Sequence, residues 1–129
     1  MTNQNDFKNQ FKNQFKNQFK DINFTSSKVK FCEVNGKQVE TLKYRAILYN
    51  NIIPEIEPEV AIETTNLKMD TNKYIKRQYK GYDWCDYLNC SIRGISGTET
   101  LYEIMHLVKV HNISISMIIE LNNGCDFII

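Results

Sequence analysis

The sequence predicts a small α+β protein in which short helices and one longer helix pack on an antiparallel sheet. Two patterns in the last third of the chain support this prediction. Leu101, Ile104 and Val108 recur at helical spacing, and from Ile113 to Leu121 every second residue is apolar. The first pattern is typical of one face of an α-helix, and the second is typical of a half-buried strand. The 129 residues of the chain are enough for one domain with its own core.

The longer helix is expected to begin at Gly97 and to end just before Asn112. Ser96 and Glu99 have the spacing of a capping box, in which the serine side chain accepts a hydrogen bond from the helix backbone. Asn112 is a stop signal, because asparagine adopts the left-handed conformation that ends many helices.

The sheet is expected to contain two hairpins and one extra strand. The hairpin near the C-terminus turns at Asn123-Gly124, a pair suited to the two-residue type I′ turn. Its returning arm should place three residues on the same face as the strand before it, namely Cys125, Phe127 and Ile129. The other hairpin turns at Asn35-Gly36, between arms at residues 29–34 and 39–49, with a bulge or bend near Arg45.

The middle of the chain is expected to hold an edge strand and two short helices. The extra strand covers residues 59–65, after an acidic connection whose two prolines exclude a central strand. A residue among 70–72 caps the first short helix, which ends at Gly81. Asp83 caps the second, which covers about residues 84–90.

A short repeat fills the N-terminal segment. The motif Phe-Lys-Asn-Gln occurs three times in residues 7–18, and Phe19-Lys-Asp follows at the same spacing. A four-residue period predicts an amphipathic helix over residues 5–22 with a slanting stripe of phenylalanines. Three roles for the stripe stay open: packing on the α+β core of residues 28–129, docking on another protein, or binding a membrane surface. We predict that residues 1–129 form a single domain.

Composition excludes few partners. Sixteen Lys and Arg against fifteen Asp and Glu give a net charge of +1, so the total charge selects no class of partner. No apolar run reaches the roughly 18 residues of a transmembrane helix, and the polar N-terminus lacks the apolar region of a secretory signal. We therefore expect a cytoplasmic protein whose four cysteines are free thiols.

Positive charge is concentrated in one stretch. Residues 71–80 hold four basic side chains and no acidic one, interleaved with tyrosines. Cations attract phosphates or acidic protein surfaces, and aromatic side chains stack on bases or anchor protein interfaces. We predict a partner-binding surface made of Lys73, Tyr74, Lys76, Arg77, Tyr79, Lys80 and Tyr82. The alternative is a solvated helix face beside core aromatics.

The sequence gives little support for metal binding or for catalysis. Cys85, Cys90, His106 and His111 have the ligand types of a zinc site. The two histidines point about 140° apart on a helix, however, so we expect no metal. The chain has no nucleophile elbow, no phosphate-binding glycine loop and no dinucleotide-binding motif. We therefore expect no catalytic residue and no cofactor.

The segment Gly94-Ile95-Ser96-Gly97 lies between two predicted helices, and a predicted strand follows the second helix. This order, over about residues 84–121, resembles the KH family of single-stranded nucleic-acid-binding domains, whose GxxG backbone clamps nucleotides. The resemblance implies direct nucleic-acid binding as the alternative function. The loop itself lacks the basic residue usual in KH domains, and Arg93 is its nearest cation.

In size and composition the chain also resembles the small anti-CRISPR and related anti-defence inhibitors of phages and other mobile elements. This resemblance implies a non-enzymatic protein that binds a larger host nuclease, or its nucleic-acid channel, and blocks it sterically. The expected partner is then a larger host protein or a nuclease–nucleic-acid complex, with no membrane and no small-molecule substrate.

Overall fold

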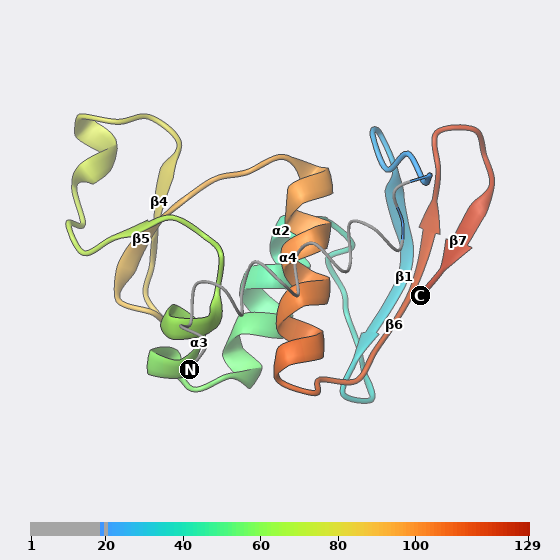
Figure 1. Cartoon of the computed structure of the whole chain (residues 1–129), viewed down its shortest axis with the longest axis horizontal. Coiled ribbons are helices and arrows are strands. Elements are labelled where there is room, and N and C mark those ends of the chain that lie inside the picture. Colours follow the sequence, from blue (N-terminus) through green and yellow to red (C-terminus); the bar gives the residue numbers. More distant parts are fainter. Residues whose placement is uncertain (1–18, 20) are drawn as a thin grey trace, which may run out of the picture.

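The computed structural model describes Phe19 and residues 21–129 of the chain. Its central element is the helix α4 (Gly97–Val110), which lies between two antiparallel sheets (Figure 1). The predicted α+β class with one longer helix is therefore confirmed, although the strands form two sheets instead of one. The predicted N-terminal helix of residues 5–22 lies almost wholly outside the described residues.

The larger sheet contains four strands and the smaller one three. The larger has the order β2-β1-β6-β7, with β2 (Lys37–Gln38), β1 (Lys28–Val34), β6 (Ile115–Glu120) and β7 (Asp126–Ile128). The smaller has the order β3-β5-β4, with β3 (Met69–Asp70), β5 (Cys90–Arg93) and β4 (Tyr82–Cys85). A single cluster of buried side chains takes Cys32 from β1, Leu101 from α4 and Ile92 from β5, so both sheets share one core.

The α4 helix begins and ends where the sequence predicts. The Ser96 side chain accepts a hydrogen bond from the backbone N–H of Glu99 at 3.2 Å, as a capping residue does. The chain leaves the helix at Asn112, whose φ is 54°. Between these ends Leu101 and Ile104 are fully buried, so the helix presents a continuous apolar face to the core.

The hairpin at Asn35-Gly36 is confirmed, but its second arm is far shorter than predicted. Asn35 and Gly36 have φ angles of 49° and 80°, as a type I′ turn requires. Lys37–Gln38 pairs with β1, and the Val39 N–H donates to the Cys32 carbonyl oxygen at 2.9 Å. The predicted strand over residues 39–49 is otherwise wrong. The chain there forms the helix α2 (Tyr44–Ile47), the π-helical turn η1 (Leu48–Ile52) and the 3₁₀ turn η2 (Ile53–Glu55).

Burial explains why this segment is helical. Ile47 and Leu48 are neighbours in the chain, and both are completely buried. In a strand they would face opposite sides of the sheet. The helix instead turns both, together with Ile52, toward the core beside α4. Tertiary packing thus decides the local structure against the strand propensity of the isoleucines.

The predicted edge strand over residues 59–65 is also wrong, because the segment forms the helix α3 (Pro58–Thr64). Pro58 lies in the first turn, where its fixed φ favours a helix and its missing N–H removes no hydrogen bond. Val60 and Ile62, the β-branched residues that favoured a strand, are 40% and 41% exposed, whereas Ala61 between them is buried. The apolar alternation therefore does not mark a buried face.

The predicted short helix capped by Asp83 is wrong as well. Asp83 and Trp84 lie within β4, and a loop at residues 86–89 leads into β5. Cys85 stands directly opposite Cys90 in this hairpin. Asn89 has a φ of 54°, a left-handed conformation that asparagine tolerates in turns and that a helix interior excludes.

The C-terminal hairpin is confirmed, although its turn differs from the predicted one. Of residues 122–124, all described, only Gly124 has a positive φ, at 85°. The Leu121 N–H donates to the Cys125 carbonyl oxygen at 2.8 Å, which closes a loop one residue longer than the predicted type I′ turn. Cys125 is consequently exposed, whereas the prediction placed it on the inner face with Phe127.

Candidate partner-binding surface

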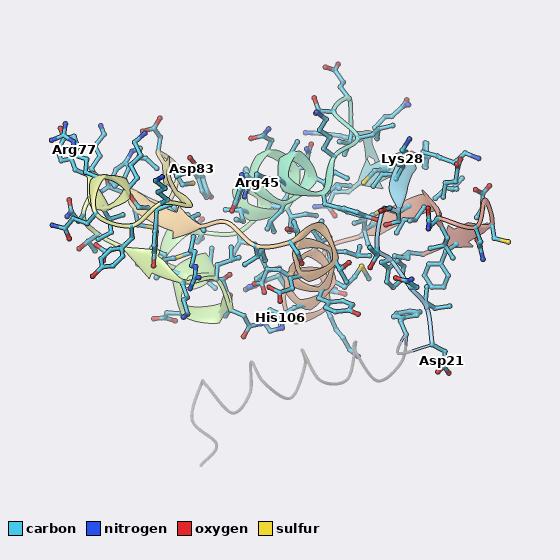
Figure 2. All side chains as sticks on the ribbon, turned by 90° about the horizontal axis from the view of Figure 1, so that it is seen from above. Asp21, Lys28, Arg45, Arg77, Asp83 and His106 are labelled. Carbon is cyan, nitrogen blue, oxygen red and sulfur yellow. The ribbon has the colours of Figure 1, made fainter. Side chains whose placement is uncertain are left out.

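The predicted binding residues lie in an excursion between β3 and β4, which we call the basic loop (residues 71–82). The loop projects at one end of the molecule, where Figure 2 labels Arg77. The predicted helix is here a single 3₁₀ turn, η3 (Ile75–Arg77). The prediction of a short capped helix is therefore wrong in length, while its position is right.

Four interactions order the start of the basic loop. Ile75 is buried under the loop with 8% of its surface exposed. The Ser91 hydroxyl on β5 donates to the Asn72 carbonyl oxygen at 3.0 Å. The Asn72 side chain accepts from the Tyr74 N–H at 2.9 Å, and the Asp70 side chain accepts from the Asn72 N–H at 2.8 Å. These contacts fix the start of the loop and leave its tip in solvent.

The side chains of the basic loop are available to a partner. Tyr74 and Tyr79 are 55% and 62% exposed. The exposed members of the predicted set are Lys73, Tyr74, Lys76, Arg77, Tyr79 and Lys80. Tyr82 is half-buried on β4, opposite Arg93. The structure therefore brings the seven predicted residues together on one element, with Tyr82 at its base.

Aromatic rings orient two of the four cations. The Arg77 guanidinium lies over the Tyr74 ring at 4.4 Å from its centre, and the Lys73 ammonium lies 5.3 Å from the centre of the Trp84 ring. Within the described part of the chain, none of the four cations forms an ion pair. The four charges are thus exposed to solvent, and ring contacts orient two of the four side chains.

The Gly94–Gly97 segment does not have the setting of a KH loop. It follows the strand β5, whereas the resemblance required a helix there, so the predicted helix–loop–helix order is wrong. Gly94 instead lies against Arg45: a Cβ at this position would meet Nη2 at the end of that flexible side chain. The Arg45 guanidinium therefore packs over Gly94, and it also lies 3.5 Å from the Asp83 carboxylate.

The two histidines and two cysteines that have the ligand types of a zinc site form other contacts. Nε2 of His106 contacts the Thr64 carbonyl oxygen at 2.7 Å, and Nε2 of His111 contacts the Thr64 hydroxyl at 2.7 Å. Cys85 and Cys90 face each other on the β4–β5 hairpin. Among the residues that the structure describes, no three His, Cys, Asp or Glu side chains are grouped so as to hold a metal ion.

The sequence reasoning missed a second feature, a hollow between η1 and the β4–β5 hairpin. Its volume is about 360 Å³, and its walls include Tyr49, Trp84 and Tyr87. The missed signal was the alternation of Tyr82 and Trp84 with Asp83, which is typical of a strand. Assigning these residues to a helix hid their proximity to Tyr49.

Comparison with known proteins adds no relative: no protein-family model, no curated protein and no solved structure matches the chain. None of the helices in the described part is both long and apolar enough to cross a membrane. We therefore infer a function from the geometry of the basic loop and its surroundings.

Proposed function

We propose that the protein is a non-enzymatic binding protein that contacts a larger macromolecule through the basic loop. One observation carries the proposal: four cations and two exposed tyrosines project from one end of the molecule, and residues 71–82 contain no acidic side chain. Such a surface is complementary to an acidic protein surface or to phosphate groups.

The loop combines two features that binding surfaces use. Exposed cations accelerate encounter with an oppositely charged partner. Tyr74 and Tyr79 supply large apolar area with few rotatable bonds, so little side-chain entropy is lost when they are buried. The Arg77–Tyr74 stack further reduces the freedom that remains to be lost on binding.

We propose further that the partner is a host nuclease and that binding blocks it sterically, as in the anti-CRISPR type of inhibitor. The support is the resemblance in size and composition, together with the charge of the loop. An empty nucleic-acid channel is itself positively charged. The basic loop therefore fits a nuclease that already holds nucleic acid, or an acidic face outside the channel. Action in the cytoplasm belongs to the same proposal.

Direct binding of single-stranded nucleic acid is the second candidate. It is supported by the same loop, because cations spaced among exposed rings suit a backbone and stacked bases. Because a strand and not a helix precedes the Gly94–Gly97 segment, this candidate has no support from a KH-type clamp. The basic loop alone would then contact the strand.

A paired charge reversal tests the proposal. The variant Lys76→Glu with Arg77→Glu reverses two exposed charges at the loop tip. The control variant Lys37→Glu with Lys43→Glu reverses two exposed charges outside the basic loop, one on β2 and one just before α2. We expect the loop variant to lose proteins that the parent captures from a host lysate, and the control to retain them. Both should change the free energy of unfolding by no more than about 0.5 kcal/mol.

Salt dependence then separates the two candidates. Binding to single-stranded DNA or RNA through four cations predicts a slope of about −3 in log affinity against log salt, at about 0.7 per phosphate contact. A protein partner predicts a weaker dependence and no mobility shift of free nucleic acid. If the loop variant captures the same proteins and shifts the same strands as the parent, the basic loop is not the binding surface.

A further inference from the structure

The hollow between η1 and the β4–β5 hairpin has the dimensions of a small-molecule site. Its volume of about 360 Å³ falls in the range of roughly 300–1,000 Å³ that ligand pockets occupy. Three aromatic side chains line it: Tyr49 from η1, Trp84 from β4, and Tyr87 from the hairpin loop. We call this space the aromatic hollow.

Hydrogen bonds fix two of the rings before any ligand arrives. The Trp84 indole N–H donates to the Asp86 carboxylate at 2.8 Å. The Tyr87 hydroxyl donates to the backbone carbonyl oxygen of Ile56. Tyr49 is half-buried, at the side of the hollow formed by η1. Rings that are already oriented lose little entropy when a ligand is bound.

The charged side chains that line the aromatic hollow are acidic. Among the described residues that line it, Asp83 and Asp86 carry carboxylates and none carries a positive charge. The Asp83 side chain is 69% exposed at the rim. Burial is the main cause that raises the pKa of Tyr49, and the Asp83 carboxylate adds to this effect while Arg45 opposes it. The phenol therefore stays neutral and leaves the charge to the two aspartates.

Two cationic side chains of the protein contact residues that line the aromatic hollow. The Arg45 guanidinium pairs with Asp83 at 3.5 Å, and the Lys73 ammonium lies over the Trp84 ring at 5.3 Å. Neither residue lines the aromatic hollow. Figure 2 shows Arg45 and Asp83 on the same side of the molecule. Asp83 and Trp84 therefore each contact a cationic group of the protein itself, Asp83 through an ion pair and Trp84 through a cation–π contact.

We propose that the aromatic hollow binds an organic cation, that is, an alkylammonium or guanidinium group. Aromatic faces attract such groups through their quadrupole, and the attraction increases when water is excluded. The two carboxylates supply the counter-charge and disfavour anions. The aromatic hollow adjoins the basic loop through Lys73, which lies over Trp84. None of the described residues that line the hollow belongs to the basic loop, so the proposal does not depend on the proposed function.

Trp84 makes the test direct, because it is the single tryptophan of the chain and lines the aromatic hollow. Its fluorescence is followed while choline is added at constant ionic strength. The matched ligand is 3,3-dimethyl-1-butanol, which has the shape of choline without its charge. We expect a saturable change with choline, and at least a tenfold weaker response to the neutral alcohol.

Two further ligands identify the source of the cation. Choline stands for a free small molecule, and N-acetyl-arginine methylamide stands for a basic side chain presented by a protein. Tighter binding of the first assigns the site to free ammonium compounds, and tighter binding of the second assigns it to a side chain of a protein partner. Either outcome supports cation binding.

A charge-removal variant tests the role of the carboxylates. Asp83→Asn with Asp86→Asn keeps an acceptor oxygen for the Trp84 N–H, so the ring keeps its orientation. We expect this variant to bind choline at least tenfold more weakly than the parent. The control, Asp21→Asn with Glu40→Gln, also removes two exposed charges and should bind as the parent does. Asp83→Asn alone provides the same comparison if the double variant does not fold.

Two results would overturn the proposal. One is an equal fluorescence response to choline and to the neutral alcohol, and the other is parent-like choline affinity in the Asp83→Asn with Asp86→Asn variant. The Lys76→Glu with Arg77→Glu variant should bind choline normally. Loss of function at the basic loop and loss of cation binding are therefore observed separately.

Discussion

The carboxylate of Glu103 accepts a hydrogen bond from the Thr65 hydroxyl at 2.7 Å, and this contact ties α4 to the segment that follows α3. The same oxygen accepts the Asn66 N–H at 3.0 Å, and the Asn66 side chain donates to the other oxygen at 3.3 Å. Glu103 and Thr65 are each 4% exposed. A buried carboxylate is stable here because three donors replace its water.

Removing the Glu103 carboxylate should therefore destabilise the fold. Glu103→Ala leaves the Thr65 hydroxyl and the Asn66 N–H without their acceptor, and we expect a loss of about 3 kcal/mol in urea unfolding. Glu103→Gln keeps one acceptor oxygen and should cost less. Glu63→Ala, on the exposed side of α3, is the control and should stay within about 0.5 kcal/mol. A loss that small for Glu103→Ala would contradict the role given to the carboxylate.

The second prediction concerns acid stability and His111. Burial, with a smaller contribution from His106, lowers the pKa of His111 below its ordinary value. The unfolded chain then takes up the proton near pH 6.5, while the folded protein does so only at lower pH. His111 therefore contributes stability that is complete above about pH 6.5 and is lost as the pH falls through the lower folded-state pKa.

A double difference isolates this contribution. Urea midpoints are measured at pH 7.5 and pH 5.5 for the parent and for His111→Gln, whose amide still donates to the Thr64 hydroxyl. The parent should lose more stability on acidification than the variant does, because carboxylate effects are common to both. Equal losses would mean that His111 titrates as it does in the unfolded chain.

The third prediction concerns the cysteines, which are all free thiols. Cys32 on β1 has no exposed surface, and burial raises its pKa to about 11. Cys125 in the C-terminal hairpin is exposed. Because the thiolate is the reactive form, a thiol reagent at pH 8 should modify Cys125 rapidly and Cys32 only after unfolding. Cys125→Ser should abolish the fast phase, and a fast phase that persists would refute the assignment.

The fourth prediction concerns Phe127, where the N-terminal segment meets the larger sheet. Phe19 and Phe24 both contact its ring edge to face, with ring centres 5.1 Å and 5.5 Å away. Phe127→Ala removes both contacts and should cost up to about 3 kcal/mol, the lower limit for a fully buried phenylalanine, because Phe127 is only partly buried. Phe127→Leu keeps most of the apolar contact and should cost clearly less. Similar losses in the two variants would show that the ring contacts contribute little.

The sequence predicted best those elements that short signals define. Ser96 and Asn112 bound α4 as expected, and Asn35-Gly36 turns the first hairpin, because capping and left-handed conformations depend on the residue itself. Ile47, Val60 and Trp84 were placed in the wrong type of element. Their local patterns fit both strand and helix. Packing beside α4 decides for Ile47, and pairing with β5 decides for Trp84. For the exposed Val60, Pro58 in the first turn favours the helix.

The two candidate surfaces, the basic loop and the aromatic hollow, also differ in how well the sequence predicts them. The basic loop was found because its residues are contiguous, and contiguous charge stays together in any fold. The aromatic hollow was missed because Tyr49 and Trp84 are distant in sequence and meet only through the packing of η1 on the small sheet. The role of the Phe-Lys-Asn-Gln repeat remains a prediction, since residues 7–18 lie outside the described part.

The strand order of the small sheet gives the basic loop one more consequence. In β3-β5-β4 both outer strands, β3 and β4, leave one edge unpaired within the sheet, and the basic loop connects these two strands. Lysines beside an open edge hinder a second molecule from adding its own strand there. We therefore expect the same cations to hinder aggregation through these edges. Replacing Lys73, Lys76, Arg77 and Lys80 with glutamine should lower the concentration at which the protein self-associates.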